Sequence, residues 1–180
     1  MEVQEAIRRR RSIRRYTEER VTHEQLQTIL ESAIWAPSGG NIQAWLFVAV
    51  TDERMIRDIK AFAPGMFGLP PALVVACADL ERARARGGRL GAEVLTICDL
   101  SMACQNMMLV ACSLGLGSCV VRSFNQTAVS RLLGLPASIR PELLVTLGTP
   151  ARIPPAPPRR PLEEVVHWER FGSAGSREGR

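Results

Sequence analysis

The sequence is short of the side chains that usually carry catalysis. Among its 180 residues there are two histidines and one tyrosine, and neither His23 nor His167 has neighbours at metal-ligand spacing. The sequence also lacks the motifs GxSxG, GxGxxG and GxxxxGK, which argues against a serine hydrolase, a Rossmann dehydrogenase or a P-loop NTPase. A chain with so little acid–base or nucleophilic equipment is typical of a protein whose chemistry belongs to a bound cofactor.

Cysteine spacing excludes two further classes. No two cysteines form a CxxC pair, and their number, five, leaves one unmatched. Most lie among apolar residues, as buried free thiols do, so neither a disulfide framework nor a metal site is expected. Residues 1–7 are amphipathic, and arginines follow where a signal peptide would place its apolar region,. We therefore expect a cytoplasmic protein with free thiols at Cys77, Cys98, Cys104, Cys112 and Cys119.

Lysine is almost missing, and arginine supplies the positive charge. Lys60 is the only lysine, and the formal net charge is +5. An arginine bias over a whole chain mostly reflects coding preference, but here arginines crowd residues 8–15 and recur at Arg159 and Arg160. The planar guanidinium suits phosphate and carboxylate groups. The clusters therefore indicate an anionic partner, either a nucleic-acid backbone or a small phosphorylated ligand.

One long stretch, residues 91–117, contains no proline and has apolar residues on nearly every face. Such a pattern predicts a buried helix, which Gly115 and Gly117 should end. A membrane span is disfavoured because four polar residues interrupt the stretch, namely Glu93, Asp99, Gln105 and Asn106,. Two alternatives stay open: a helix buried within one subunit, and a helix that also packs against a second subunit.

The rest of the chain predicts an α+β domain with helices packed around one sheet. Apolar runs predict strands at 45–50, 72–78, 118–121 and 143–147,. Thr22 with Gln25 has the spacing of a capping box, and Thr51 or Asp52 and Asn125 are candidate caps of later helices,. The arginine- and glycine-rich residues 81–88 are expected to form an exposed connection. No repeat or second domain is evident, so residues 1–180 are predicted to form a single domain.

The end of the chain has a different character. Residues 150–161 are rich in proline and predict an extended arm, because proline breaks helices and central strands,. Residues 162–171 regain apolar side chains that need cover, and we expect them to dock on a partner. Residues 173–180 are expected to fray.

Three polar stretches stand beside the predicted element ends. They are RRSIRRY at residues 10–16, PSGGNIQ at residues 37–43, and the pair Arg159 and Arg160. Each has an ordinary alternative: a solvated basic helix end, a turn, or a charged tail. Their order along one chain is more informative than any one of them.

In this order the chain resembles the nitroreductase family of FMN flavoproteins. RRSIRRY is similar to the family's opening motif and APSGGNIQAWLFV to its second; DLSMACQNMMLVACSLGLGSCVV resembles its central helix and following strand, and LGTPARIPPAPPRRPLEEVVHWERF its closing segment. The resemblance implies an α+β sandwich with a central sheet of about four to five strands flanked by helices. It also implies a homodimer with two FMN sites at the interface, and an arm that extends to the partner subunit.

The resemblance also assigns roles to residues. It places Arg10, Arg11 and Ser12 at the FMN phosphate and ribityl chain, and Arg14 near N1 and O2 of the flavin. Residues from the second subunit would approach the ring and ribityl chain: Pro37, Ser38, Gly39, Asn41 and Gln43. Gly117, Ser118 and Cys119 would lie over the isoalloxazine. Arg159 and Arg160 would return to the phosphate, although Pro157 stands where some relatives carry a further cation.

The implied activity is ping-pong hydride transfer from NADH or NADPH through FMN to a nitroaromatic, a quinone or a similar electron-poor acceptor. The flavin N5 carries the chemistry, Arg14 tunes it, and no side chain acts as a catalytic residue. The alternative within the same fold is a specialised flavin enzyme, such as a dehalogenase, a flavin-cleaving enzyme or an azoline oxidase. A nucleic-acid-binding module is disfavoured because no aromatic residues interleave with the arginines,. Neither nucleic acid nor membrane is expected as a partner.

Overall fold

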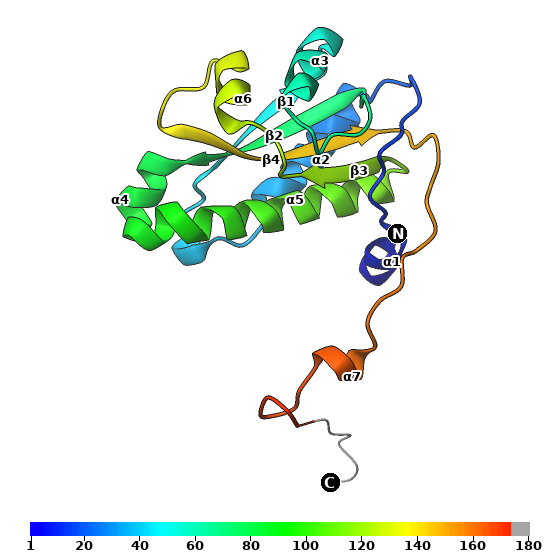
Figure 1. The fold of residues 1–180 in the computed structure, drawn as a ribbon, viewed down its shortest axis with the longest axis vertical. Helices are drawn as coiled ribbons and strands as arrows, with labels where there is room; N and C mark the ends of the chain where they lie inside the picture. The colour runs from blue at the N-terminus through cyan, green and yellow to red at the C-terminus, as the bar shows by residue number, and fades with distance from the viewer. Residues whose placement is uncertain (174–180) are drawn as a thin grey trace.

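A four-stranded antiparallel sheet forms the centre of the computed structural model, which describes residues 1–173 (Figure 1). The strands are β1 (Trp45–Val50), β2 (Ala72–Asp79), β3 (Gly117–Val121) and β4 (Ile139–Gly148), in the spatial order β1-β2-β4-β3. The predicted α+β class is confirmed, and each predicted strand is present. The part of the expected frayed end at 174–180 lies outside the described residues.

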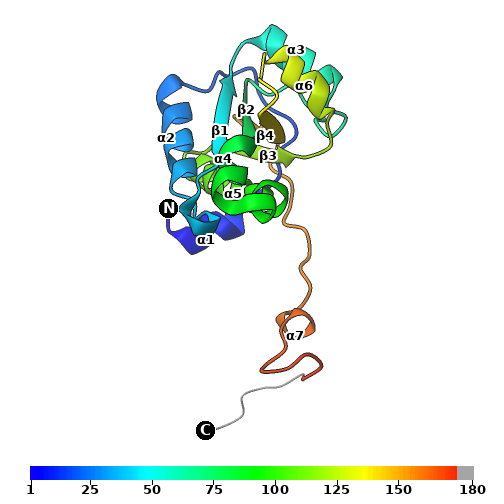
Figure 2. The same ribbon diagram turned by 90° about the vertical axis from the view of Figure 1, so that its left-hand side faces the viewer.

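Helices cover both faces of the sheet. On one face lie α2 (His23–Ile34) and α5 (Thr96–Ser113), with α1 (Val3–Arg9) beside α5; on the other lie α3 (Glu53–Ala61) and α6 (Gln126–Leu132) (Figure 2). Successive strand residues point to opposite faces, so Val74 and Val145 pack with α2 and α5 while Leu73 and Leu144 pack with α3 and α6.

Local capping explains where three of the helices begin. The Thr22 hydroxyl accepts from Gln25 N–H at 3.1 Å and the Gln25 side chain accepts from Thr22 N–H at 2.9 Å, which completes the predicted capping box of α2. Asp52 caps α3 through Met55 N–H at 2.7 Å, and Asn125 caps α6. Each contact satisfies a backbone donor that the first turn of a helix leaves open.

A helix that was not predicted, α4 (Leu80–Leu90), precedes the central helix. The central helix itself begins with a π-helical turn (Gly91–Leu95) and continues as α5. The expectation of a connection at 81–88 is therefore wrong, whereas most of these residues are exposed as predicted. The carboxylate of Asp79 caps α4 by accepting from Arg82 N–H at 2.9 Å, and Ala83 is fully buried. Gly88 has φ +58° and breaks the regular geometry inside α4, which is the break that the glycines suggested.

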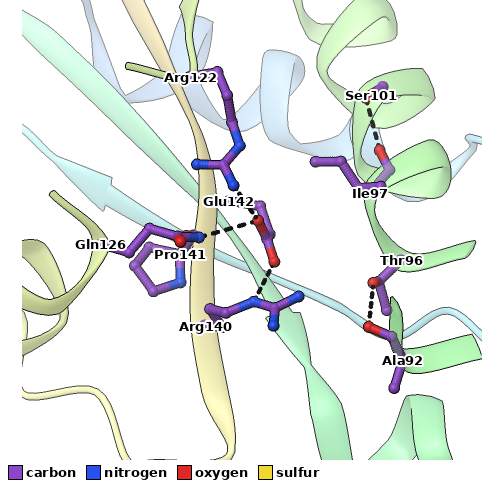
Figure 3. Close-up of polar contacts among 9 residues, drawn as sticks. All are labelled: Ala92, Thr96, Ile97, Ser101, Arg122, Gln126, Arg140, Pro141 and Glu142. Atoms are coloured by element: carbon purple, nitrogen blue, oxygen red, sulfur yellow. Dashed lines mark hydrogen bonds and ion pairs between the residues drawn. The ribbon is translucent and has the colours of Figure 1, made fainter. Parts of the chain in front are cut away.

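This helix is long and apolar enough to cross a membrane by length and composition alone, but the core helix of a soluble protein passes the same test. The Leu80–Ser113 helix has a mean hydropathy of 1.5 over its most apolar window, 44% of which is buried inside the protein. The buried face packs on the sheet and on α2 through Leu100, Ala103, Cys104, Met107 and Ala111. The hydroxyls of Thr96 and Ser101 donate to the carbonyls of Ala92 and Ile97, so these polar groups are satisfied within the helix (Figure 3).

Strand β4 also begins earlier than predicted, because it runs through Pro141. This proline lies opposite Cys77, where the register between β2 and β4 shifts. A proline has no N–H to donate, and such an irregularity is where a strand tolerates it. The Pro141 carbonyl accepts from the side-chain amide of Gln126 in α6 at 2.7 Å.

A buried carboxylate lies next to this proline. The side chain of Glu142 is 3% exposed and lies between two arginines, pairing with Arg140 on its own strand and with Arg122 at 3.4 Å (Figure 3). It also accepts from the Gln126 amide at 3.1 Å. Since Arg122 follows β3 and Gln126 lies in α6, Glu142 connects three elements.

The end of the chain leaves the body of the protein. Residues 150–161 are extended, as predicted, and lead to the short helix α7 (Leu162–Val165), far from the sheet in both views (Figures 1 and 2). The apolar side chains beyond residue 161 are exposed, with Leu162 at 68% and Phe171 at 93%. The arm therefore carries apolar surface that its own chain does not cover.

The Glu142 contacts generate a stability prediction. Glu142→Ala should lower the free energy of unfolding by about 2 kcal/mol, less than a fully buried pair would lose, because both arginines keep access to water. The matched control is Glu53→Ala, which removes an exposed ion pair with Arg57 and should cost no more than about 0.5 kcal/mol,. Urea denaturation of the two variants measures the difference. Equal losses of unfolding free energy would contradict the stabilising role of the buried Glu142 contacts.

Candidate functional site

The RRSIRRY segment lies along the beginning of β3. Ser12 forms a parallel bridge with Ser118, and Ile13 N–H donates to the Ser118 carbonyl at 2.9 Å. A Cβ on Gly117 would lie 2.6 Å from the Ile13 side chain, so the absence of a side chain there admits Ile13. The structure thus brings Ser12 together with Gly117, Ser118 and Cys119. The side chain that packs directly against Gly117, however, is that of Ile13.

The same segment is fastened on its other side to the chain that leaves β4. Thr17 N–H donates to the Thr149 carbonyl at 2.9 Å, and Ala151 N–H donates to the Arg15 carbonyl at 3.0 Å. Residues 12–17 therefore form a strap between β3 and residues 149–151. We call this segment the arginine strap.

Tyr16 anchors the arginine strap from beneath. Its hydroxyl lies 2.7 Å from the Ile13 carbonyl and 2.6 Å from the Thr146 hydroxyl, which itself donates to the Cys119 carbonyl at 3.1 Å. Burial raises the pKa of Tyr16 far above its ordinary value. Its proton is therefore held in a structural contact and is poorly suited to transfer.

The arginines of this region keep their charge uncompensated. Within residues 1–173, no ion pair involves Arg10, Arg11 or Arg14. Arg11 donates to the carbonyls of Arg8 at 2.6 Å and Arg10 at 2.9 Å, and Arg14 lies 5.9 Å from the centre of the Phe67 ring. Guanidiniums without an acidic partner are suited to binding an anion.

A small pocket opens beside Arg14. It is lined by Ile13 and Tyr16 of the arginine strap, by Met66 and Phe67, and by Cys119 with Thr146 beneath. Gly68 approaches the strap so closely that a Cβ there would lie 2.2 Å from the Arg14 carbonyl oxygen. Residues 65–68 thus form one wall of this pocket.

Residues 37–43 form a second, separate part of the candidate site, which we call the PSGGNIQ loop. Three of its residues have left-handed backbone geometry: Gly40 at φ +59°, Asn41 at +52° and Gln43 at +53°. Gln43 N–H donates to the Ser38 hydroxyl at 3.1 Å, and the Gln43 amide donates to the Asn41 side chain at 2.9 Å. Asn41 and Gln43 are nevertheless exposed, as is Pro37.

The long helix holds these two parts apart. Gly39 of the PSGGNIQ loop contacts Asp99 near the start of α5 through its N–H, at 3.1 Å from the carboxylate, whereas the arginine strap lies beyond the end of α5 at Ser113. At about 1.5 Å per residue, Asp99 and Ser113 are separated by roughly 20 Å along the axis. Figure 1 shows α4 at one end of α5 and α1 at the other.

The third predicted part lies on the arm. Arg159 and Arg160 are exposed, and Arg160 pairs with Glu164 at 3.1 Å. Within one chain the predicted residues therefore form three groups: the strap with the start of β3, the PSGGNIQ loop, and the arm.

Sequence reasoning missed two residues that hold the PSGGNIQ loop. Asp99 was treated only as evidence against a membrane span, yet it is 4% exposed and binds Gly39 N–H. Burial raises the pKa of Asp99, and the hydrogen bond from Gly39 opposes that shift. Arg82 Nε donates to the Ile42 carbonyl at 2.6 Å. The sequence feature that could have revealed Asp99 is that it is an isolated acid in an otherwise apolar helix.

Comparison with known proteins decides the family. The model described as "Nitroreductase family" matches residues 7–67 and 58–149. The chain belongs to the nitroreductase family. The resemblance drawn from the four motifs is confirmed, and so is the α+β sandwich that it implied.

Individual members of the family show the same likeness. The chain is 32% identical to an NADH dehydrogenase of Thermus thermophilus, over 93% of this chain and 96% of that protein. It is 32% identical to an oxygen-insensitive NADPH nitroreductase of Salmonella typhimurium, over 89% and 71%. Its structure is similar to that of an NADPH:FMN oxidoreductase from Vibrio harveyi complexed with NAD+, with a TM-score of 0.84, 29% identity, and coverage of 94% of this chain and 77% of that one.

The role of Tyr16 can be tested directly in this nitroreductase-family protein. Tyr16→Phe removes the hydroxyl that joins Ile13 and Thr146, and should lower the free energy of unfolding by about 1 to 2 kcal/mol. Because the hydroxyl supports the arginine strap and transfers no proton, turnover of the folded variant should stay within about twofold of wild type. Urea denaturation and steady-state kinetics check the two parts. A loss of turnover by orders of magnitude with unchanged stability would show instead that the Tyr16 hydroxyl transfers a proton.

Proposed function

We propose that this nitroreductase-family protein is an FMN-dependent NAD(P)H oxidoreductase. The observation that carries the proposal is the uncompensated charge of Arg10, Arg11 and Arg14, held beside Ser12 by backbone pairing with β3. Guanidiniums and a hydroxyl in this arrangement suit the phosphate of FMN. The names of relatives support it: flavin, FMN and NAD(P)H recur among them.

FMN, when bound, supplies hydride transfer at its N5 atom, and the chain supplies binding and electrostatics. Arg10, Arg11 and Ser12 would hold the phosphate end. Arg14, in the wall of the pocket beside Cys119, would place positive charge near the pyrimidine side of the ring, where the reduced flavin carries negative charge,. None of these side chains has to transfer a proton.

The finer activity is ping-pong exchange at one position. NADH or NADPH would donate first and leave, and an electron-poor acceptor such as a nitroaromatic or a quinone would then take its place. Support comes from the pocket, which is small and has Phe67, with 73% of its area exposed, at one wall. An exposed aromatic ring beside Arg14 offers a flat surface for a planar acceptor.

We extend the proposal to a homodimer that carries two cofactor sites. The separation of the PSGGNIQ loop from the arginine strap supports this, because a second copy can bring its loop to the first copy's strap. Exposed apolar side chains on α1 and after α2, Val3 at 69%, Ile7 at 54% and Trp35 at 83%, offer surface for such a contact. The arm would reach across with Leu162 and Phe171, and Arg159 would approach the phosphate. Obligate dimer interfaces are hydrophobic, so a dimer contact would cover these exposed apolar side chains.

The cytoplasm is the compartment proposed for this protein. The five cysteines are all free, and Cys77 and Cys104 are buried thiols whose pKa burial raises to about 12. Thiols of this kind are inert and suit a reducing compartment.

Purification provides the first test of the function. We expect a yellow protein that releases FMN, and no FAD, on denaturation, because the chain supplies a phosphate site and no adenosine-binding fingerprint. The bound flavin should bleach on addition of NADH or NADPH and regain its colour with a nitroaromatic or quinone. Visible absorbance and chromatography of the released flavin are the measurements. A colourless protein that also fails to bind added FMN would overturn the proposal.

Arg14 provides the second test. Arg14→Ala should retain FMN through Arg10, Arg11 and Ser12, but should lower the flavin reduction potential by on the order of 30 mV, the two-electron equivalent of about 1.4 kcal/mol. Reduction by NAD(P)H should slow because the reduced flavin loses its counter-charge. The matched control is Arg15→Ala, which removes the neighbouring exposed arginine and should leave the potential unchanged. Equal potentials in both variants would place Arg14 away from the ring.

A further inference from the structure

The PSGGNIQ loop has a backbone that needs outside support. Asn41 and Gln43 both have positive φ, at +52° and +53°. Asparagine tolerates this region, but for glutamine it costs on the order of 1 kcal/mol. Such geometry persists only where surrounding groups determine it, and it is concentrated at functional sites.

One charged side chain from α4 and one from α5 supply that support. Asp99 of α5 accepts from Gly39 N–H at 3.1 Å, and Arg82 of α4 donates from Nε to the Ile42 carbonyl at 2.6 Å. These backbone groups flank the first left-handed residues, Gly40 and Asn41. We propose that Asp99 and Arg82 form a clamp that fixes the PSGGNIQ loop, so that Asn41 and Gln43 are positioned to contact the cofactor of the partner subunit.

Packing makes the clamp rigid. A Cβ on Gly39 would lie 2.8 Å from the Leu95 side chain, so the loop backbone rests directly on the π-helical turn. Ile42 is buried in a small cluster with Ala83 of α4 and Ala92 of the same turn. The loop is therefore held by two polar contacts and by apolar packing, supplied by α4, the π-helical turn and α5.

An acid at position 99 indicates that this residue positions the loop and does not serve mainly to stabilise the fold. Burial raises the pKa of Asp99, so its ionised form costs folding free energy near neutral pH,. An asparagine would accept the same hydrogen bond without that cost. A carboxylate is nevertheless a stronger acceptor for an N–H group than an amide oxygen, which restrains Gly39 more tightly.

The loop presents its polar side chains outward from the clamp. Asn41 and Gln43 are exposed and are joined to each other by a hydrogen bond of 2.9 Å. This pairing leaves the Asn41 amide and the Gln43 carbonyl oxygen available for a ligand. Asp99 and Arg82 face the loop backbone, so they act through the loop and are positioning residues.

This inference depends on the proposed function, so its test separates the two. Asp99→Ala removes the acceptor, Asp99→Asn retains it, and Glu93→Ala is the matched control, because Glu93 is an exposed acid of the same helix whose partner is Arg89 at 2.8 Å. Hydrogen exchange of the Gly39 amide in the FMN-free protein reports on the clamp. Titration with FMN reports on its consequence.

We expect Asp99→Ala to accelerate exchange at Gly39 and to weaken FMN binding about tenfold. Asp99→Asn should restore the affinity to within about threefold of wild type, and Glu93→Ala should match wild type in both measurements. For the other arm of the clamp, Arg82→Ala should behave like Asp99→Ala, with Arg89→Ala as its control. The urea midpoint of each FMN-free variant separates loss of positioning from loss of folding.

Two outcomes would overturn the inference in distinguishable ways. If wild type binds FMN and Asp99→Ala binds it equally well, the clamp has no part in the site, whereas the proposed function stands. If wild type itself does not bind FMN, the proposed function fails, and the role of the clamp in positioning a cofactor contact fails with it. Rescue by Asp99→Asn is the result that a general loss of packing would not give.

Discussion

The length of helix α5 (Thr96–Ser113) is the constraint on which the candidate site depends. This helix forms the core of one face of the sheet, and it carries a different functional segment at each end. Near Asp99 it holds the PSGGNIQ loop, and beyond Ser113 the chain turns into β3, where Ser118 pairs with the arginine strap. A rigid helix cannot shorten, so the two segments stay apart within one chain. Two copies related by a twofold axis can place the loop of each against the strap of the other, which is the basis of the proposed dimeric site.

Each functional segment is fixed by backbone contacts, while its charged or polar side chains stay available. The arginine strap is held by Ile13 N–H on Ser118, by Ala151 N–H on Arg15 and by the Tyr16 hydroxyl, so Arg14 needs no acidic partner to hold it. The PSGGNIQ loop is held through Gly39 and Ile42, which leaves Asn41 and Gln43 exposed. Anchoring through the backbone suits a protein whose chemistry belongs to a bound group. The side chains that bind this group are then preorganised, and they do not have to pair with other side chains of the protein.

Local signals predicted much of this fold, and the failures have tertiary causes. The caps at Thr22, Asp52 and Asn125 act within three residues, so the sequence reveals them. Helix α4 was missed because Gly87 and Gly88 suggest a loop, whereas burial of Ala83 and capping by Asp79 favour a helix. The extension of β4 through Pro141 depends on a register shift in β2, and the role of Asp99 depends on a partner 60 residues away. The strap was predictable as a motif, but its pairing with β3 was visible only in the structure.

Subunit complementation tests the shared site most directly. One chain would carry Arg10→Ala with Ser12→Ala, and the other Asn41→Ala with Gln43→Ala, so that each homodimer has a defect in every site. A heterodimer of the two has one site with both defects and one site with none. We predict that each variant alone is colourless and that mixed, co-refolded dimers regain about one FMN per heterodimer. A mixture that stays colourless, although sedimentation shows heterodimers, would mean that strap and loop do not meet across the interface and would contradict the shared site.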